Sequence, residues 1–316
     1  MTFSQEVKSE ILKSARNLQG SNATSFLTAV LKSAGSLMLG DFGLAFSLDS
    51  DNLELLTLCK NIAVEQLGSD ACIETHEPHI KNQPSHTCTF DASVGQKLGL
   101  TTRDRDGALT LCEDVASLIP SDLAAKRSFM QGLFVSCGSV GIPTPDKDSQ
   151  NSSNALGSKY HLELRFTDEA FAMAVAASFP ELDHFLSRKS HCVLYLKDSE
   201  RIADFLVFVN ATKAKFALTD VIILRSMRNE FNRQNNCIIA NIGKTVDAAL
   251  RQLQAIEALR SMGAFDELPN QLKDIALLRE KYPEATLDEI ADMLSISKSG
   301  ANHRFNKLIE LSQRNI

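Results

Sequence analysis

Two stretches in the first two hundred residues share one pattern of apolar and polar positions. Residues 23–36 and 126–139 each have the apolar spacing of a helix and end in Gly-Ser, and each is followed by segments in which apolar and polar residues alternate. In chain order the pattern predicts strands within 37–48, 72–77, 87–90, 160–166 and 191–196, and helices at 53–67, 168–178 and 199–209. The repeated order of helix, strands and helix indicates an internal duplication.

Beyond residue 211 the alternating pattern ends and only helical spacing remains. Residues 220–236 and 239–260 predict two long helices, with Gly263 as a cap at the end of the second. Pro269 suits the first turn of the helix that follows. Three short helices are then expected to complete the chain.

The last fifty residues have the pattern of a helix-turn-helix. A capping box from Thr286 to Glu289 opens the second short helix, and after the break at 295–297 a third helix begins at Lys298. In a helix-turn-helix the last helix enters the major groove of DNA. The residues that we expect to point outward and to bind phosphates or base edges are Lys298, Ser299, Asn302, His303, Arg304 and Lys307. From charge and capping alone, the solvated end of a helical bundle explains the same pattern equally well.

A second polar stripe precedes this tail. Arg225, Asn229, Asn232 and Asn236 are spaced so that they share one face of a helix. Asn is a poor helix former, so its recurrence indicates side-chain hydrogen bonds that offset the cost. Either the amides form a network that docks the helix onto its neighbours, or they contact DNA phosphates. The basic residues that we add as DNA-binding candidates in this region are Arg228, Arg233 and Lys244.

The formal net charge of −6 is distributed unevenly along the chain. Residues 1–217 contain 20 Lys and Arg against 26 Asp and Glu, whereas residues 218–316 contain 13 of each. Within the second region, residues 264–295 are acidic, and the last 21 residues have four basic and one acidic side chain. The acidic average therefore does not exclude a nucleic-acid partner, because positive charge is confined to short helical stretches.

The composition predicts a protein of the cytoplasm. The apolar runs are shorter than the roughly 18 residues that cross a membrane, and the N-terminus is polar where a signal peptide has an apolar core. The seven cysteines include no Cys-x-x-Cys pair, so we expect reduced packing residues, not zinc ligands or disulfides. We expect no metal, no cofactor and no membrane partner.

Two long strings in the C-terminal region carry a family resemblance. The string from Leu294 to Leu308, Leu-Ser-Ile-Ser-Lys-Ser-Gly-Ala-Asn-His-Arg-Phe-Asn-Lys-Leu, and the upstream string from Asn229 to Lys244 closely resemble the WhiA family of bacterial transcription regulators. That resemblance spans the chain. It implies a domain derived from LAGLIDADG homing endonucleases joined to a C-terminal helix-turn-helix, with roles in sporulation or cell division of Gram-positive bacteria.

The resemblance implies an α+β fold, in which a duplicated LAGLIDADG-like α/β saddle domain is followed by an all-α helix-turn-helix domain. The expected segments are a first LAGLIDADG-like half at 1–120, a second half at 121–217, a helical connector at 218–263 and a helix-turn-helix DNA-binding domain at 264–316.

The family's nuclease relatives cut DNA with acidic metal ligands, one just before the final Gly of each of two packed helices. On this chain the motif places Ala34 and Cys137 at those positions, and neither supplies a carboxylate for Mg²⁺. The earlier acidic position is Lys32 in one copy and Val135 in the other. We therefore expect no catalytic residue, and helices retained for structure. The small residues that we expect to let the two helices pack closely are Ala29, Ser33, Gly132 and Ser136.

These inferences favour a DNA-binding transcription regulator of the cytoplasm that associates with the nucleoid and acts in sporulation, cell division or chromosome segregation, without nuclease activity. Its expected partners are double-stranded DNA and a protein co-regulator. An alternative of another class is a protein-interaction scaffold linked to cell division, whose acidic N-terminal domain meets a protein and whose DNA contact is secondary. A surviving LAGLIDADG-type endonuclease is the third interpretation.

Overall fold

The computed structural model describes residues 1–40, 43–77, 85–104, 107–143, 160–180, 182, 184–188 and 191–314 of the 316-residue chain. The chain divides into two compact units, Met1–Leu224 and Arg225–Ile316, and each has its own hydrophobic core. The long helix α8 (Thr212–Ser261) begins in the first unit and ends in the second. In the described ranges no helix is long and apolar enough to cross a membrane.

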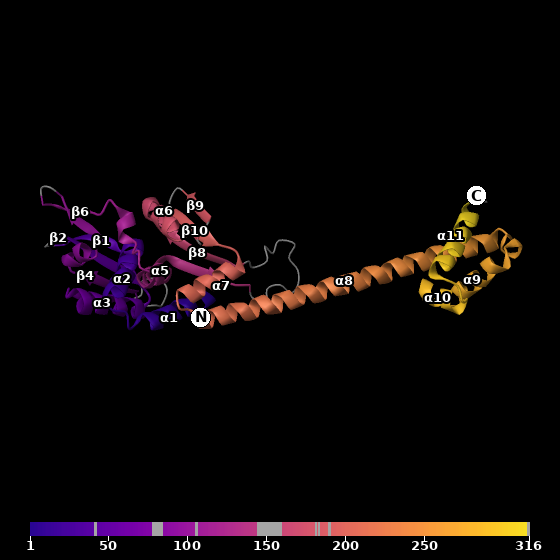
Figure 1. Cartoon of the computed structure of the whole chain (residues 1–316), viewed down its shortest axis with the longest axis horizontal. Coiled ribbons are helices and arrows are strands. Elements are labelled where there is room, and N and C mark those ends of the chain that lie inside the picture. Colours follow the sequence, from indigo (N-terminus) through magenta and orange to yellow (C-terminus); the bar gives the residue numbers. More distant parts are fainter. Residues whose placement is uncertain are drawn as a thin grey trace. The chain divides into compact units, whose positions relative to one another are not determined.

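The first unit combines helices with antiparallel strands (Figure 1). Its helices are α1 (Phe3–Ala15), α2 (Gly20–Ala34), α3 (Leu53–Leu67), α4 (Ala92–Lys97), α5 (Leu123–Cys137), α6 (Glu169–Ser178) and α7 (Ser199–Phe208), with a 3₁₀ turn at Val115–Leu118. Its strands are β1 (Ser36–Gly40), β2 (Gly43–Ser50), β3 (Ala71–His76), β4 (Ser85–Phe90), β5 (Thr101–Arg103), β6 (Leu109–Leu111), β7 (Gly138–Gly141), β8 (His161–Phe166), β9 (His184–Arg188) and β10 (His191–Leu196).

Two four-stranded sheets repeat one topology. The first has the order β1-β2-β4-β3 and the second has the order β7-β8-β10-β9, and every pairing in both is antiparallel. The helix α2 leads into the first sheet, and α5 leads into the second. The predicted internal duplication and the α+β fold class are therefore confirmed. The sequence pattern did not predict β9 or the small β5-β6 sheet, because both are short and neither has a long run of alternation.

The helices α2 and α5 lie side by side in the centre of this unit (Figure 1). A Cβ atom added to Gly132 would lie 2.4 Å from the carbonyl oxygen of Phe26 and 3.0 Å from the Cβ of Ala29, so only glycine permits this approach. The hydroxyls of Ser33 and Ser136 are 2.6 Å apart across the same pair. The expectation that small residues bring these two helices together is confirmed.

The second unit is entirely helical in its described part. After α8 a 3₁₀ turn at Phe265–Glu267 leads to α9 (Asn270–Lys281), α10 (Leu287–Met293) and α11 (Lys298–Arg314). The three predicted short helices are confirmed. Gly263 has a left-handed φ of 72° after the end of α8, as a C-terminal cap requires, and Pro269 directly precedes α9.

The prediction of two separate long helices over 220–236 and 239–260 was wrong. Both belong to the single helix α8. The residues between them, Cys237 and Ile238, are not residue types that end a helix. Gly243 lies inside α8, and no proline follows it to end the helix. A change in the apolar spacing was therefore interpreted as a break in the backbone.

Candidate nucleic-acid interface

The helix α11 is held in the second unit by an apolar stripe on one side. Ala301, Phe305 and Leu308 are at most 1% exposed, as their helical spacing predicts. They pack in one core with Ile275 of α9 and Ile290 of α10. Since one stripe of α11 is buried among the preceding helices, its opposite side is fixed as the outward surface of the unit.

A buried arginine ties α11 to the rest of this unit. Arg279 of α9 is only 2% exposed, and its guanidinium donates hydrogen bonds to the side chain of Gln252 at 2.8 Å and to the carbonyl of Ala285 at 2.6 Å. Its carbon Cζ lies 5.2 Å from the centre of the Phe305 ring. Burial lowers the pKa of Arg279. The sequence did not identify this residue, which joins α8, the α9–α10 loop and α11.

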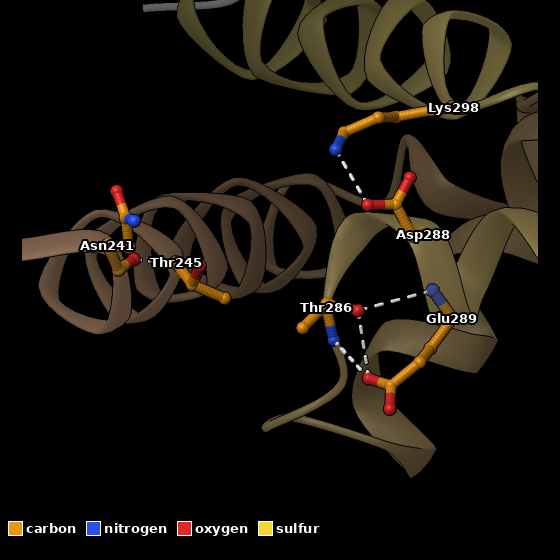
Figure 2. Close-up of polar contacts among 6 residues, drawn as sticks. All are labelled: Asn241, Thr245, Thr286, Asp288, Glu289 and Lys298. Carbon is orange, nitrogen blue, oxygen red and sulfur yellow. Dashed lines mark hydrogen bonds and ion pairs between the residues drawn. The ribbon is translucent and has the colours of Figure 1, made fainter. Parts of the chain in front are cut away.

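The turn before α11 is set by local hydrogen bonds. The hydroxyl of Thr286 accepts from the backbone of Glu289 at 3.2 Å, and the Glu289 carboxylate accepts from the backbone of Thr286 at 2.7 Å, which confirms the predicted capping box (Figure 2). Ser295 has a left-handed φ of 52°, which turns the chain after α10. The hydroxyl of Ser297 then accepts from the backbone of Gly300 at 3.1 Å and caps α11.

The six residues expected to bind DNA on α11 do not share one face. At 100° per residue, Asn302 and Arg304 lie on opposite flanks of the helix, and Arg304 is partly buried. Ser299, Asn302 and His303 are exposed on the outward side. Asn306, which the sequence interpretation missed, is exposed between Asn302 and His303 and one turn farther along. The sequence signal that could have identified Asn306 is its position four residues after Asn302, which places both on the same face of the helix.

Two of the expected basic contacts are already in ion pairs. The ammonium of Lys298 lies 2.6 Å from the Asp288 carboxylate of α10 (Figure 2), and that of Lys307 lies 3.0 Å from Glu310, which also pairs with Arg314. The hydrogen bond from Lys307 is the main cause that lowers the pKa of Glu310. Exposed pairs of this kind contribute little stability, so a phosphate can displace the carboxylate from either lysine.

The three asparagines of the polar stripe on α8 are exposed, whereas Arg225 is partly buried. Asn229, Asn232 and Asn236 make no side-chain hydrogen bond within the described part of the chain, so the docking network considered from the sequence is not found there. The basic candidates of this helix, Arg228, Arg233 and Lys244, are exposed as well.

The positions of the nuclease metal ligands lie at the ends of α2 and α5. Ala34 lines a cavity of about 910 Å³ together with Lys8, Asp49 and Asp51, and burial lowers the pKa of Lys8. The Cys137 thiol donates to the carbonyl of Leu133 at 3.2 Å, and burial raises the pKa of this thiol to about 11. Among the described residues no cluster of three His, Cys, Asp or Glu side chains is arranged to hold a metal.

Comparisons with known proteins agree with this architecture. Residues 126–228 match the family described as the WhiA LAGLIDADG-like domain, and residues 231–312 match the WhiA C-terminal HTH domain. The "Probable cell division protein WhiA" of Staphylococcus carnosus is 31% identical over 327 residues, which cover 99% of this chain and 97% of that protein. Its namesake in Clostridium acetobutylicum is 28% identical over 324 residues, with 99% and 98% covered.

One solved structure shares the fold over the whole chain. The crystal structure of full-length DUF199/WhiA from Thermatoga maritima has a TM-score of 0.55 and 21% sequence identity, and the match covers 99% of each chain. The resemblance seen in the sequence is thus confirmed. The chain belongs to the WhiA family and combines a LAGLIDADG-like domain with a helix-turn-helix domain.

Proposed function

We propose that this protein is a transcription regulator that binds double-stranded DNA through α11 and acts in cell division, chromosome segregation or sporulation. The observation that carries the proposal is that the polar side chains on the outward side of α11 are exposed and unpaired. Ser299, Asn302, His303 and Asn306 are exposed there, and within the described residues their side chains have no hydrogen-bond partner. The matched helix-turn-helix family and the name of the relatives support the same conclusion.

The chemistry of these side chains suits base recognition. The amide of Asn302 or Asn306 can donate to and accept from the edge of adenine in the major groove. The beginning of α11 has free backbone N–H groups, and Lys298 stands at that end of the helix, so a phosphate is favoured there. His303 is a second base contact, whereas Lys307 contacts the backbone of the duplex.

Nuclease activity is not part of the proposed function. A metal-dependent cut needs carboxylates at the ends of α2 and α5, and these positions hold Ala34 and the neutral thiol of Cys137. We expect pure protein with Mg²⁺ or Mn²⁺ to leave a mixed plasmid library uncut. Metal-dependent cutting that is lost when Asp49 or Asp51 of the nearby cavity is replaced by Asn would contradict this expectation.

A protein-interaction scaffold is the second candidate function, and one feature of the first unit favours it. A cavity of about 450 Å³ between α5 and α7 has a mostly apolar lining that includes Leu123, Met130, Phe179, Phe205 and Phe208. Such a cavity suits an apolar side chain of a protein co-regulator. The salt dependence of binding affinity distinguishes the two functions. DNA binding weakens steeply as ionic strength rises, whereas an apolar protein interface does not.

Each segment of the chain has its own role in the proposed function. Residues 264–316 bind DNA, and residues 218–263 connect this domain to the rest of the chain. The two LAGLIDADG-like halves at 1–120 and 121–217 bind a protein co-regulator. The site of action is the nucleoid in the cytoplasm.

The direct test is genome-wide mapping of DNA crosslinked to the full-length chain in a bacterium that encodes it. The Asn302→Ala, Asn306→Ala double variant is compared with the unmodified chain at equal abundance. We expect discrete peaks that share a sequence and that are lost in the variant. Peaks that persist unchanged in the variant would contradict the role of α11, and no enrichment with either chain would favour the scaffold function.

A further inference from the structure

The helix-turn-helix segment has an unusual charge for a DNA-binding domain. Residues 264–316 contain seven Lys and Arg against nine Asp and Glu. Double-stranded DNA has about one negative charge per 1.7 Å of helix axis, and proteins bind it largely by neutralising phosphates with Lys and Arg. Since the segment as a whole is negative, its affinity for phosphates depends on which of its cations are available in the free protein.

Most basic side chains of α11 already have an anionic partner. Three of the four are in ion pairs with carboxylates of the same unit, and the fourth, Arg304, is partly buried. Lys307 and Arg314 both pair with Glu310, which lies three and four residues away on the same helix. The third pair differs from these, because its carboxylate comes from another helix.

This third pair joins the beginning of α11 to the beginning of α10. Lys298 is the first residue of α11, and its ammonium lies 2.6 Å from a carboxylate oxygen of Asp288, the second residue of α10 (Figure 2). The capping box of Thr286 and Glu289 fixes the first turn of α10, to which Asp288 belongs. The side chains of the pair are 64% and 59% exposed. The pair therefore lies on the surface, where a ligand can reach it.

The Asp288 carboxylate and a DNA phosphate compete for the same ammonium. In the proposed function a phosphate binds at the beginning of α11, where the backbone N–H groups and Lys298 favour an anion. Lys298 can bind both anions at once only if the phosphate comes close to Asp288, and there the two negative charges repel each other. Binding of the duplex therefore requires that the ion pair open.

We propose that Asp288 limits the affinity of α11 for DNA by holding Lys298 in an ion pair in the free protein. The inference rests on the DNA-binding function proposed for α11. Asp288 acts through Lys298 and does not itself contact the duplex. Because the phosphate contact is weakened in this way, binding depends more on the base edges that Asn302 and Asn306 recognise and less on the DNA backbone.

The Asp288→Asn variant of the full-length chain tests the role of the carboxylate. Fluorescence anisotropy measures its affinity for the duplex recovered by crosslinking and for an unrelated duplex. We expect both affinities to rise by about fivefold at low salt, since an exposed ion pair contributes at most about that factor. The slope of log affinity against log salt should become steeper by about one, because one more cation is free to replace a counterion of the DNA.

The matched control is Asp292→Asn. Asp292 is exposed one turn after Asp288 on α10, and among the described residues its carboxylate has no ion pair. The change removes the same charge from the same helix without releasing a lysine. We expect the affinity to rise by less than about twofold, because salt screens the effect of a single distant charge. An equal rise in both variants would show that only the net charge matters, and would overturn the proposal.

A double-mutant cycle tests whether Asp288 acts through Lys298. In the Lys298→Met background, which keeps the length of the side chain without its charge, Asp288→Asn should no longer raise the affinity. A rise that persists there would show that Asp288 repels the duplex directly, and would overturn the proposal.

The same measurements separate this inference from the function on which it rests. If the unmodified chain and all these variants bind neither duplex, the DNA-binding function proposed for α11 is wrong. If the unmodified chain binds DNA and Asp288→Asn leaves its affinity and salt slope unchanged, only the inference about Asp288 is wrong.

Discussion

The ends of the α2–α5 pair and the outward side of α11 differ in how their polar side chains are used. At the α2–α5 pair the polar side chains already have hydrogen-bond partners within the protein. The hydroxyls of Ser33 and Ser136 are 2.6 Å apart, and the Cys137 thiol donates to a backbone carbonyl of its own helix. On α11 the amides of Asn302 and Asn306 are exposed and unpaired within the described residues.

In the proposed function the LAGLIDADG-like fold is retained without nuclease chemistry. The close packing of α2 on α5 depends on small residues such as Gly132 and is independent of the metal ligands. The fold therefore survives the presence of Ala34 and Cys137 where carboxylates would be required. In the proposed function the DNA-binding surface is α11 of the small helical unit, whose outward polar groups the fold itself does not use.

The largest loss of stability is expected at Arg279, which holds α11 in the second unit. Replacing Arg279 with Ala removes hydrogen bonds to the buried side chain of Gln252 and to the partly buried carbonyl of Ala285 and leaves both groups without this donor. We expect a loss of about 3 kcal/mol in the free energy of unfolding of the second unit. Urea denaturation followed by circular dichroism measures it. The Arg279→Met variant keeps most of the volume and separates packing from hydrogen bonding. A loss below about 1 kcal/mol would show that Arg279 does not hold the unit together.

A smaller effect is expected at the α2–α5 pair. The Gly132→Ala change places a methyl group 2.4 Å from the Phe26 carbonyl oxygen, so the helices must separate. We expect it to cost about 2 kcal/mol in thermal unfolding. Gly243→Ala is the matched control, because nothing lies within 4 Å of the added Cβ and the helix should gain about 0.5–1 kcal/mol. Equal effects of the two changes would contradict the close approach of α2 and α5.

Much of the fold could be predicted because it depends on local pattern. The apolar spacing of Ala301, Phe305 and Leu308 predicts which side of α11 is buried, and the capping box at Thr286 predicts where α10 begins. Arg279 could not be predicted in this way. Its burial depends on Gln252, 27 residues away, and on a loop carbonyl, and neither leaves a periodic signal in the sequence.

The candidate site was predicted less completely than the fold. A list of outward residues does not distinguish the two flanks of a helix, so Arg304 was grouped with Asn302 although they lie on opposite flanks. Asn306 was overlooked although the same helical geometry places it beside Asn302. The continuity of α8 could not be predicted because the apolar spacing changes within the helix although the backbone does not break.

The smallest effect is expected at Lys307, which must leave Glu310 to reach a phosphate. The Lys307→Ala change should weaken binding equally on all DNA sequences and reduce the slope of log affinity against log salt by about one. Fluorescence anisotropy with a labelled duplex at several salt concentrations measures this slope. If the slope does not change, Lys307 remains paired with Glu310 in the complex and is not a phosphate contact.

In the proposed function, α11 reads bases through its exposed amides. The most direct measurement is the affinity of the full-length chain and of its Asn302→Ala variant for the duplex recovered by crosslinking and for an unrelated duplex, at one salt concentration. We expect a loss of about 1–3 kcal/mol in binding free energy on the recovered duplex and no change on the unrelated one. An equal loss on both duplexes would show that α11 positions the protein on DNA without reading its sequence, and would contradict base recognition by Asn302.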